Sequence, residues 1–213
     1  MQPQPKPYLT PEEYLTLERQ AETKSEYWNG ETYAMAGASR VHMTIVANMV
    51  IGLGGQLEKR PCEVYPNDMR VKVKPSGLYT YPDVVIVCGK VEFEDRREDT
   101  LLNPTVIVEV LSPSTQAYDR TTKFELYRKL TSLSEYLLVA QDRPFVEHYM
   151  RQPDGRWVLN EYEGLDAVIH IASIGCDLPL AKVYNKVTWP EVEKTLKGLL
   201  RLVKEPGGEY LPR

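Results

Sequence analysis

Apolar residues recur at helical spacing in the first third of the chain. Residues 10–13, Thr-Pro-Glu-Glu, combine a capping hydroxyl, a proline suited to the first helical position and a glutamate that can reach back to the cap. They predict a short helix that ends near Ala21. A 3.6-residue stripe over residues 41–50 predicts a second helix, capped by Ser39 and ended by the glycines of residues 52–55.

A β-hairpin is predicted between these two helices. Asn29-Gly30 lies between aromatic and β-branched residues, and this dipeptide favours a type I′ turn because both central positions need positive φ. With these residues at the turn, Glu26 lies opposite Tyr33 and Trp28 lies opposite Glu31. Both glutamates therefore lie on one face of the hairpin.

The middle of the chain holds three nearly continuous apolar runs, typical of strands buried on both faces: residues 84–88, 104–111 and 136–140. A helix predicted from residue 119 or 120 to residue 130 separates the second run from the third. A strand–helix–strand unit of this length forms a right-handed crossover, and its two strands become parallel neighbours.

The remaining segments predict antiparallel strands and one more helix. Residues 64–65 and 69–73 read as an alternating pair, and a late meander comprises residues 146–150, 157–161 and 168–171. An amphipathic pattern predicts a C-terminal helix over residues 188–204. The sequence therefore predicts a single domain over residues 1–213, with its core at about 9–184. The expected fold is α/β (α+β): a central mixed β-sheet flanked by helices, with an added antiparallel β-meander and the C-terminal helix.

Composition narrows the class of protein. The 213 residues include 26 Lys and Arg against 30 Asp and Glu, a net charge of −4 that excludes a strongly basic nucleic-acid coat protein. No run approaches the roughly 20 apolar residues that span a bilayer, and residues 1–7 lack the apolar core of a signal peptide. We therefore expect a cytoplasmic protein without a membrane partner. Three scattered cysteines, Cys62, Cys88 and Cys176, suggest neither a disulfide framework nor a zinc site.

Two acidic residues lie on otherwise apolar strands. Glu109 sits within residues 106–111, where an ionised carboxylate is paired, protonated or bound to metal unless its head reaches solvent at an edge. Asp83 follows Pro82 at the start of another apolar run, although Pro-Asp is also ordinary turn chemistry. If these strands pair antiparallel, Asp83 and Glu109 come together as hard oxygen ligands suited to Mg²⁺ or Mn²⁺.

Lys123 is the third candidate. It shares a helical stripe with Leu126, Tyr127 and Leu130, the face that a crossover helix turns toward its sheet. Its ammonium could instead extend outward to solvent. Beside a buried pair of acids, however, it could balance their charge and later stabilise charge on a phosphate.

These motifs resemble a known family. Pro82-Asp83 followed by Glu109 resembles the signature of the PD-(D/E)XK nuclease superfamily. A longer ordered series resembles the Uma-type family of restriction endonucleases over roughly residues 9–184; it comprises residues 26–31, 81–85, 108–115, 119–127 and 134–137. The superfamily's usual lysine would be residue 111, which here is Leu111. In the Uma-type family the lysine comes from the following helix, which points to Lys123.

The resemblance implies a restriction endonuclease-like fold, DNA as the substrate, and Mg²⁺ (or Mn²⁺) held by Asp83 and Glu109. It also implies further site residues. Glu31 matches a third acid, with a surface salt bridge as its alternative, and Glu26 shares the same face. His42 matches a position that the family often fills with histidine, although a histidine on a helix face is also commonly structural. Tyr127 belongs to the matched helix.

The predicted function is metal-dependent hydrolysis of DNA phosphodiester bonds, with Lys123 orienting water or balancing charge. Two alternatives remain open: a catalytically inactive module of the same fold that binds nucleic acid or a partner, and a metal-dependent hydrolase of another phosphate ester. Phosphate contacts would come from basic side chains such as Arg70, Lys72, Lys74, Arg120 and Arg128. Apolar surface on the meander and the terminal helix could pair two copies into a homodimer.

Overall fold

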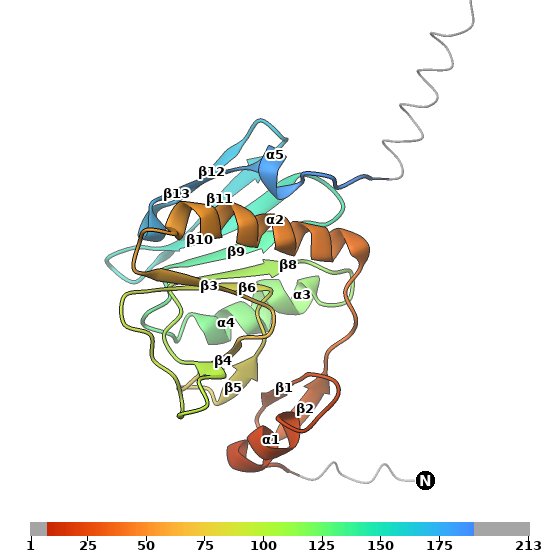
Figure 1. Ribbon diagram of the computed structural model, residues 1–213, viewed down its shortest axis with the longest axis vertical. Helices are drawn as coiled ribbons and strands as arrows, with labels where there is room; N and C mark the ends of the chain where they lie inside the picture. Colours follow the sequence, from red (N-terminus) through yellow and green to blue (C-terminus); the bar gives the residue numbers. More distant parts are fainter. Residues whose placement is uncertain (1–7, 190–213) are drawn as a thin grey trace, which may run out of the picture.

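The computed structural model describes residues 8–189, with a six-stranded sheet at their centre (Figure 1). In spatial order its strands are β11 (Trp157–Glu163), β10 (Phe145–Arg151), β9 (Glu135–Val139), β8 (Val106–Val110), β6 (Val84–Cys88) and β3 (Cys62–Pro66). β8 and β9 run parallel, and the other neighbours run antiparallel. The three apolar runs are thus the adjacent strands β6, β8 and β9, and both predicted pairings are confirmed.

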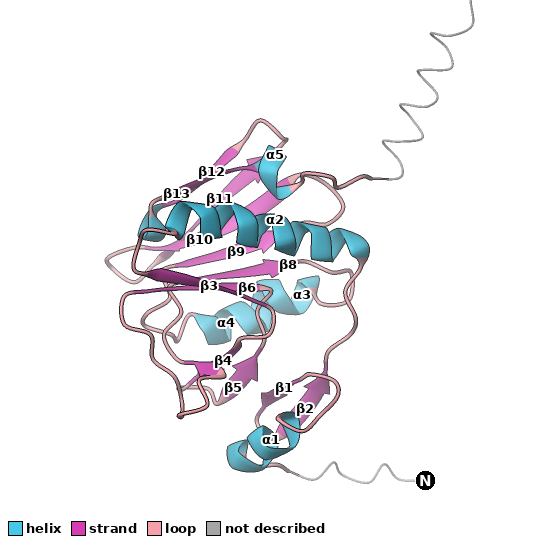
Figure 2. Ribbon diagram, viewed as in Figure 1, coloured by secondary structure: helices cyan, strands magenta, loops and turns pink. Residues whose placement is uncertain are grey.

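Helices cover both faces of this sheet (Figure 2). The long helix α2 (Arg40–Leu57) packs on one face, where Met49 belongs to the same buried apolar cluster as Ile86 of β6 and Val108 of β8. The other face is covered by α3 (Gln116–Tyr118), a π-helical turn (Asp119–Lys123) and α4 (Phe124–Tyr127). Because side chains alternate along a strand, both faces of the central strands are apolar and buried.

A second sheet of five strands lies beside the first. Its order is β2 (Glu31–Ala34), β1 (Ser25–Trp28), β5 (Leu78–Thr80), β4 (Arg70–Val73) and β7 (Thr100–Leu101), and α1 (Pro11–Glu18) packs against β1. The third strand of the predicted meander, β12 (Val168–Ile171), does not pair with β11. It forms a two-stranded sheet with β13 (Cys176–Pro179); a 3₁₀ turn (Ala172–Ile174) joins the two strands, and α5 (Leu180–Val183) follows. The predicted capping box and hairpin register are both present.

Four further predicted elements differ from the observed ones, and the first is α1, which ends at Glu18 rather than near Ala21. α2 does not end at residues 52–55 but continues to Leu57, and a Cβ on Gly52 would lie 2.7 Å from Leu178 Cδ1. The glycine at this position therefore permits close packing, and tertiary contacts keep the helix intact. Residues 64–65 and 69–73 do not pair, because β3 joins the large sheet and β4 joins the small one. The crossover helix begins earlier than predicted, at Gln116, and contains a π-helical turn.

The cysteines also depart from expectation. Cys62 and Cys88 are direct partners across β3 and β6 and form a disulfide, whereas Cys176 is a buried free thiol. The two cysteines are 26 residues apart and meet because β3 pairs with β6, which their spacing alone did not indicate. Of the predicted C-terminal helix, residues 190–204 lie outside the described residues. Between residues 8 and 189, no helix has the length and apolarity needed to cross a membrane.

Candidate active site

The candidate residues meet where the chain passes from the five-stranded sheet to the six-stranded one. β5 ends at Thr80, and Asp83 directly precedes β6. Val84 pairs with Val108, so the next step of the same register places Asp83 opposite Glu109. The predicted antiparallel arrangement of the two strands therefore brings the two acids to neighbouring positions.

Lys123 is the centre of a buried ionic cluster. Its Nζ lies 3.0 Å from Oε1 of Glu109 and 3.0 Å from Oε1 of Glu26. Oδ1 of Asp119, one π-helical turn earlier, lies 3.7 Å away. Lys123 is 6 % exposed and Glu109 is 4 % exposed, so the charges rely on one another rather than on water.

Two hydroxyl groups complete this cluster. The Tyr127 hydroxyl donates to Oε1 of Glu109 at 2.9 Å, and the Thr80 hydroxyl donates to Glu26. These hydroxyls lie 3.3 Å from each other. Every polar contact of the Glu109 carboxyl uses Oε1, and within residues 8–189 no hydrogen bond reaches Oε2. The second oxygen of Glu109 is therefore available to a cation.

The cluster holds more acids than one ammonium can balance. Burial raises the pKa of Glu109 to about 8. The positive charge of Lys123 lowers this pKa, and the negative charges of Asp119, Asp83 and Glu26 raise it further. Burial likewise raises the pKa of Asp119. Burial alone would lower the pKa of Lys123, but Glu109 and the other acids hold it well above its usual value. Lys123 is therefore charged, and the raised pKa values of Glu109 and Asp119 favour the protonated form of these acids over their ordinary behaviour.

Asp83 is held in place by groups from α2 and β8. The backbone N–H of Val110 donates to its Oδ2 at 2.7 Å, and His42 Nε2 lies 2.8 Å from its Oδ1. Gln141, two residues after the end of β9, places its Nε2 3.3 Å from His42 Nδ1 and donates to the Leu111 carbonyl at 2.8 Å. These contacts orient the imidazole and, through it, the Asp83 carboxylate.

The donor set suits a hard divalent cation. Asp83 and Glu109 offer carboxylate oxygens from adjacent strands, the ligand type that Mg²⁺ and Mn²⁺ prefer. In the described part of the chain, no three His, Cys, Asp or Glu side chains enclose one metal position. Mg²⁺ is usually held by one or two carboxylates, with water and substrate phosphates as its other ligands. A pair of neighbouring carboxylates therefore fits Mg²⁺.

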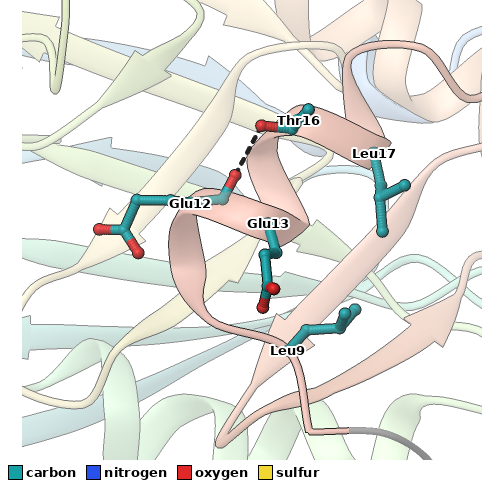
Figure 3. A pocket seen from close by; sticks show the side chains of 5 residues that line it. All are labelled: Leu9, Glu12, Glu13, Thr16 and Leu17. Atoms are coloured by element: carbon teal, nitrogen blue, oxygen red, sulfur yellow. Dashed lines mark hydrogen bonds between the residues drawn. The ribbon is translucent and has the colours of Figure 1, made fainter.

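A surface hollow beside α1 is separate from this chemistry. It is lined by Leu9, Glu12, Glu13, Thr16 and Leu17 (Figure 3). The Thr16 hydroxyl in it donates to the Glu12 carbonyl of its own helix. None of the candidate residues lines the hollow, so it adds nothing to the site.

Comparison with known proteins identifies the family. The model of the Uma2 family, described as "Putative restriction endonuclease", matches residues 11–181. The chain belongs to the Uma2 family. The uncharacterised protein slr1290 of Synechocystis sp. is 35 % identical over 182 residues, which cover 85 % of this chain and 94 % of that protein. A second Synechocystis protein, sll1609, is 38 % identical over 164 residues, 77 % of this chain and 93 % of that protein.

A solved structure gives the fold. The crystal structure of a "putative nuclease" from Anabaena variabilis superposes with a TM-score of 0.70 at 19 % identity, over 84 % of this chain and 99 % of that one. Both the resemblance to the Uma2 family and the restriction endonuclease-like fold are thereby confirmed.

Within this Uma2 chain, the predicted site residues fall into two groups. Asp83, Glu109, Lys123, Tyr127 and Glu26 lie in or beside the cluster, and His42 contacts Asp83. Glu31 does not reach the cluster. It pairs with Trp28 as predicted, but its side chain is exposed and its hydrogen bond comes from the Tyr33 hydroxyl. Docking of the hairpin on β5 therefore brings Glu26, rather than Glu31, to Lys123.

Sequence reasoning missed three members of this Uma2 site. Asp119 lies four residues before Lys123 and so shares its side of the helix, a spacing that could have indicated it. No such spacing indicates Thr80 or Gln141. Each contacts a residue far away in the sequence, Thr80 with Glu26 and Gln141 with His42, so its place in the site depends on the tertiary fold. Several basic residues expected to contact phosphate are engaged elsewhere: Arg70 with Tyr81 and Thr100, Lys72 with Glu94, and Arg120 with Glu147.

Proposed function

We propose that this protein is a Mg²⁺-dependent (or Mn²⁺-dependent) endonuclease that hydrolyses phosphodiester bonds of DNA. The observation that carries the proposal is the position of Lys123, whose Nζ lies 3.0 Å from Glu109 and 3.0 Å from Glu26. Asp83, directly before β6, lies opposite Glu109 in the strand register. Membership of a family described as "Putative restriction endonuclease", and the fold shared with a protein described as a "putative nuclease", support this assignment.

Each residue would have a distinct part. The metal would be held by the Asp83 carboxylate and by Oε2 of Glu109. His42 and the backbone N–H of Val110 keep the Asp83 carboxylate oriented. When bound, Mg²⁺ supplies a Lewis acid that polarises the phosphate and favours attack by water. Lys123 stabilises negative charge as it develops on the phosphate, and Tyr127 fixes the Glu109 carboxyl. Glu26 holds the Lys123 ammonium in position.

Nicking of supercoiled plasmid tests the proposal. Wild-type protein is expected to nick with Mg²⁺ and not with EDTA. Asp83→Asn and Lys123→Met should each lower the rate at least about 100-fold, because removing one electrostatic contact to the transition state has that order of effect. Lys129→Met, an exposed lysine on the segment after α4, is the matched control and should retain full activity.

The hairpin glutamates supply an internal comparison in the same assay. Glu26→Gln removes a charge in contact with Lys123 and should lower nicking, whereas Glu31→Gln changes an exposed side chain and should not. Circular dichroism would establish that all variants remain folded. Wild-type protein that lacks Mg²⁺-dependent nicking, or an Asp83→Asn variant as active as wild type, would overturn the assignment. A parallel series of RNA and a generic phosphodiester separates a DNA nuclease from a hydrolase of other esters.

A further inference from the structure

The outer face of α2 is unusual for a helix on the surface of a protein. Between Arg40 and Glu58 the sequence contains no Asp, Glu, Lys or Arg. Met49 is fully buried at the middle of the helix, and the side opposite it exposes Met43, Ala47 and Ile51. In Figure 1, α2 lies across the near side of the sheet with no other described element in front of it. Surface helices ordinarily carry charged residues on such a face.

The positions that form the outer face of α2 are symmetric about Met49. These positions are 40, 43, 47, 51, 55 and 58. Each position before residue 49 has a counterpart the same number of residues after it. Large residues have small counterparts: Met43 corresponds to Gly55, and Ile51 corresponds to Ala47. Among the described residues, no atom outside the helix's own backbone lies within 4 Å of the Cβ position of Gly55, so this place accepts an incoming side chain.

The charges at the ends of α2 follow the same symmetry. Arg40 precedes the apolar face and Glu58 follows it; both are exposed, and neither forms an ion pair within residues 8–189. They lie 18 residues apart, which is five full helical turns, so they project from the same side of the helix. If a second α2 packed antiparallel on the first, the Arg40 of one copy would face the partner's Glu58.

We propose that the outer face of α2 is an isologous interface at which two copies of this chain pair, with their α2 helices antiparallel about a two-fold axis level with Met49. In that register Ile51 lies level with the partner's Ala47, and Met43 lies level with the partner's Gly55. Arg40 meets the partner's Glu58 at each end, so both shape and charge are self-complementary. The proposal concerns association alone and does not rest on the proposed nuclease function.

Sedimentation velocity of the full chain, from about 1 µM to about 100 µM, tests this pairing. The wild type is expected to form a dimer at the upper end of this range. Ile51→Lys places two charges at the centre of the interface and should weaken the dimer at least about tenfold. The matched control is Val158→Lys on β11, also an exposed apolar position (43 % exposed against 73 % for Ile51), which should leave the dimer unchanged.

A charge exchange tests the register. Arg40→Glu and Glu58→Arg should each weaken the dimer, and the double variant should restore it. A chain that stays monomeric throughout the range overturns the proposal and leaves this face to another segment of the chain or to a different protein. A dimer that Val158→Lys dissociates and Ile51→Lys does not would place the interface on β11 instead. Failure of the double variant to recover would overturn the antiparallel register.

Discussion

Glu109 lies where a carboxylate is poorly solvated, inside the central strand β8 and covered by α4. Its neighbours Val108 and Val110 are buried, and its main balancing charge is the Lys123 ammonium. This environment was predictable from the sequence, because a single acid within a continuous apolar run must find a partner, a proton or a metal once it is buried. The identity of its partners was only partly predictable: Lys123 followed from its helical stripe, whereas Glu26 required knowledge of where the hairpin docks.

The raised pKa of Glu109 has a consequence for stability in the absence of metal. Burial raises this pKa from 4.5 to about 8, so between these values the folded protein retains a proton that the unfolded chain releases. Stability conferred by that proton is therefore present at low pH and is lost as pH rises toward 8. The expected loss is on the order of 1 kcal/mol per pH unit.

Chemical unfolding in EDTA at pH 5.5, 7.0 and 8.0, compared between wild type and Glu109→Gln, measures this effect. The glutamine is neutral at every pH, so the variant should lack this part of the decline and lose less stability than wild type as pH rises. Because other titrating groups are common to both proteins, the difference between the two slopes isolates Glu109. Identical slopes would show that the Glu109 carboxyl is already ionised across this range.

At the scale of elements, α2 shows how packing overrides local preference. Glycines at positions 52, 54 and 55 weaken a helix, and the sequence alone favoured an ending there. The helix continues because its inner face, including Leu53 and Leu57, is fully buried against the core. The strands show the same limit: their existence followed from their composition, but the separation of β3 from β4 into different sheets depends on long-range pairing.

The glycines of α2 should respond differently to alanine. Within residues 8–189, no atom outside the helix's own backbone lies within 4 Å of a Cβ on Gly54, so Gly54→Ala is expected to raise the free energy of unfolding by about 0.5–1 kcal/mol through helix propensity. A Cβ on Gly52 would lie 2.7 Å from Leu178 Cδ1, so Gly52→Ala must displace Leu178 and should lower stability by about 1–3 kcal/mol. Urea denaturation measures both. Equal effects of the two substitutions would contradict the close contact at Gly52.

The π-helical turn is an element-scale feature that the sequence did not indicate. The predicted regular helix already placed Lys123 toward the sheet. The observed turn over Asp119–Lys123 brings the Asp119 carboxylate to 3.7 Å from the Lys123 ammonium, and both side chains are buried. A π-helical turn often marks a functional position, because tertiary contacts must compensate for its weaker hydrogen bonding. Here the compensating contacts are those of the acid cluster.

At the scale of the whole molecule, the site lies at the junction of two sheets, with Glu26 on one and Glu109 on the other. The net charge of −4 and this buried cluster both oppose the approach of a polyanion. Arg70, Lys72 and Arg120 do little to offset this, because each is paired or buried within the protein. Of the basic residues expected to contact phosphate, Lys74 and Arg128 are exposed. A bound divalent cation is therefore the main candidate for attracting phosphate to the site.

Affinity for DNA should consequently depend on metal. Fluorescence anisotropy with a labelled duplex measures this affinity. The Lys123→Met variant keeps the acids and is expected to cleave at least about 100-fold more slowly than wild type, which allows the measurement in Mg²⁺. We expect affinity at constant ionic strength to rise at least about tenfold when Mg²⁺ replaces EDTA, since neutralised phosphates dominate binding to DNA. Adding Asp83→Asn should reduce this gain, because one metal ligand loses its charge. Tight binding of equal strength in EDTA would instead indicate that a protein surface, rather than the metal site, provides the contact with phosphate.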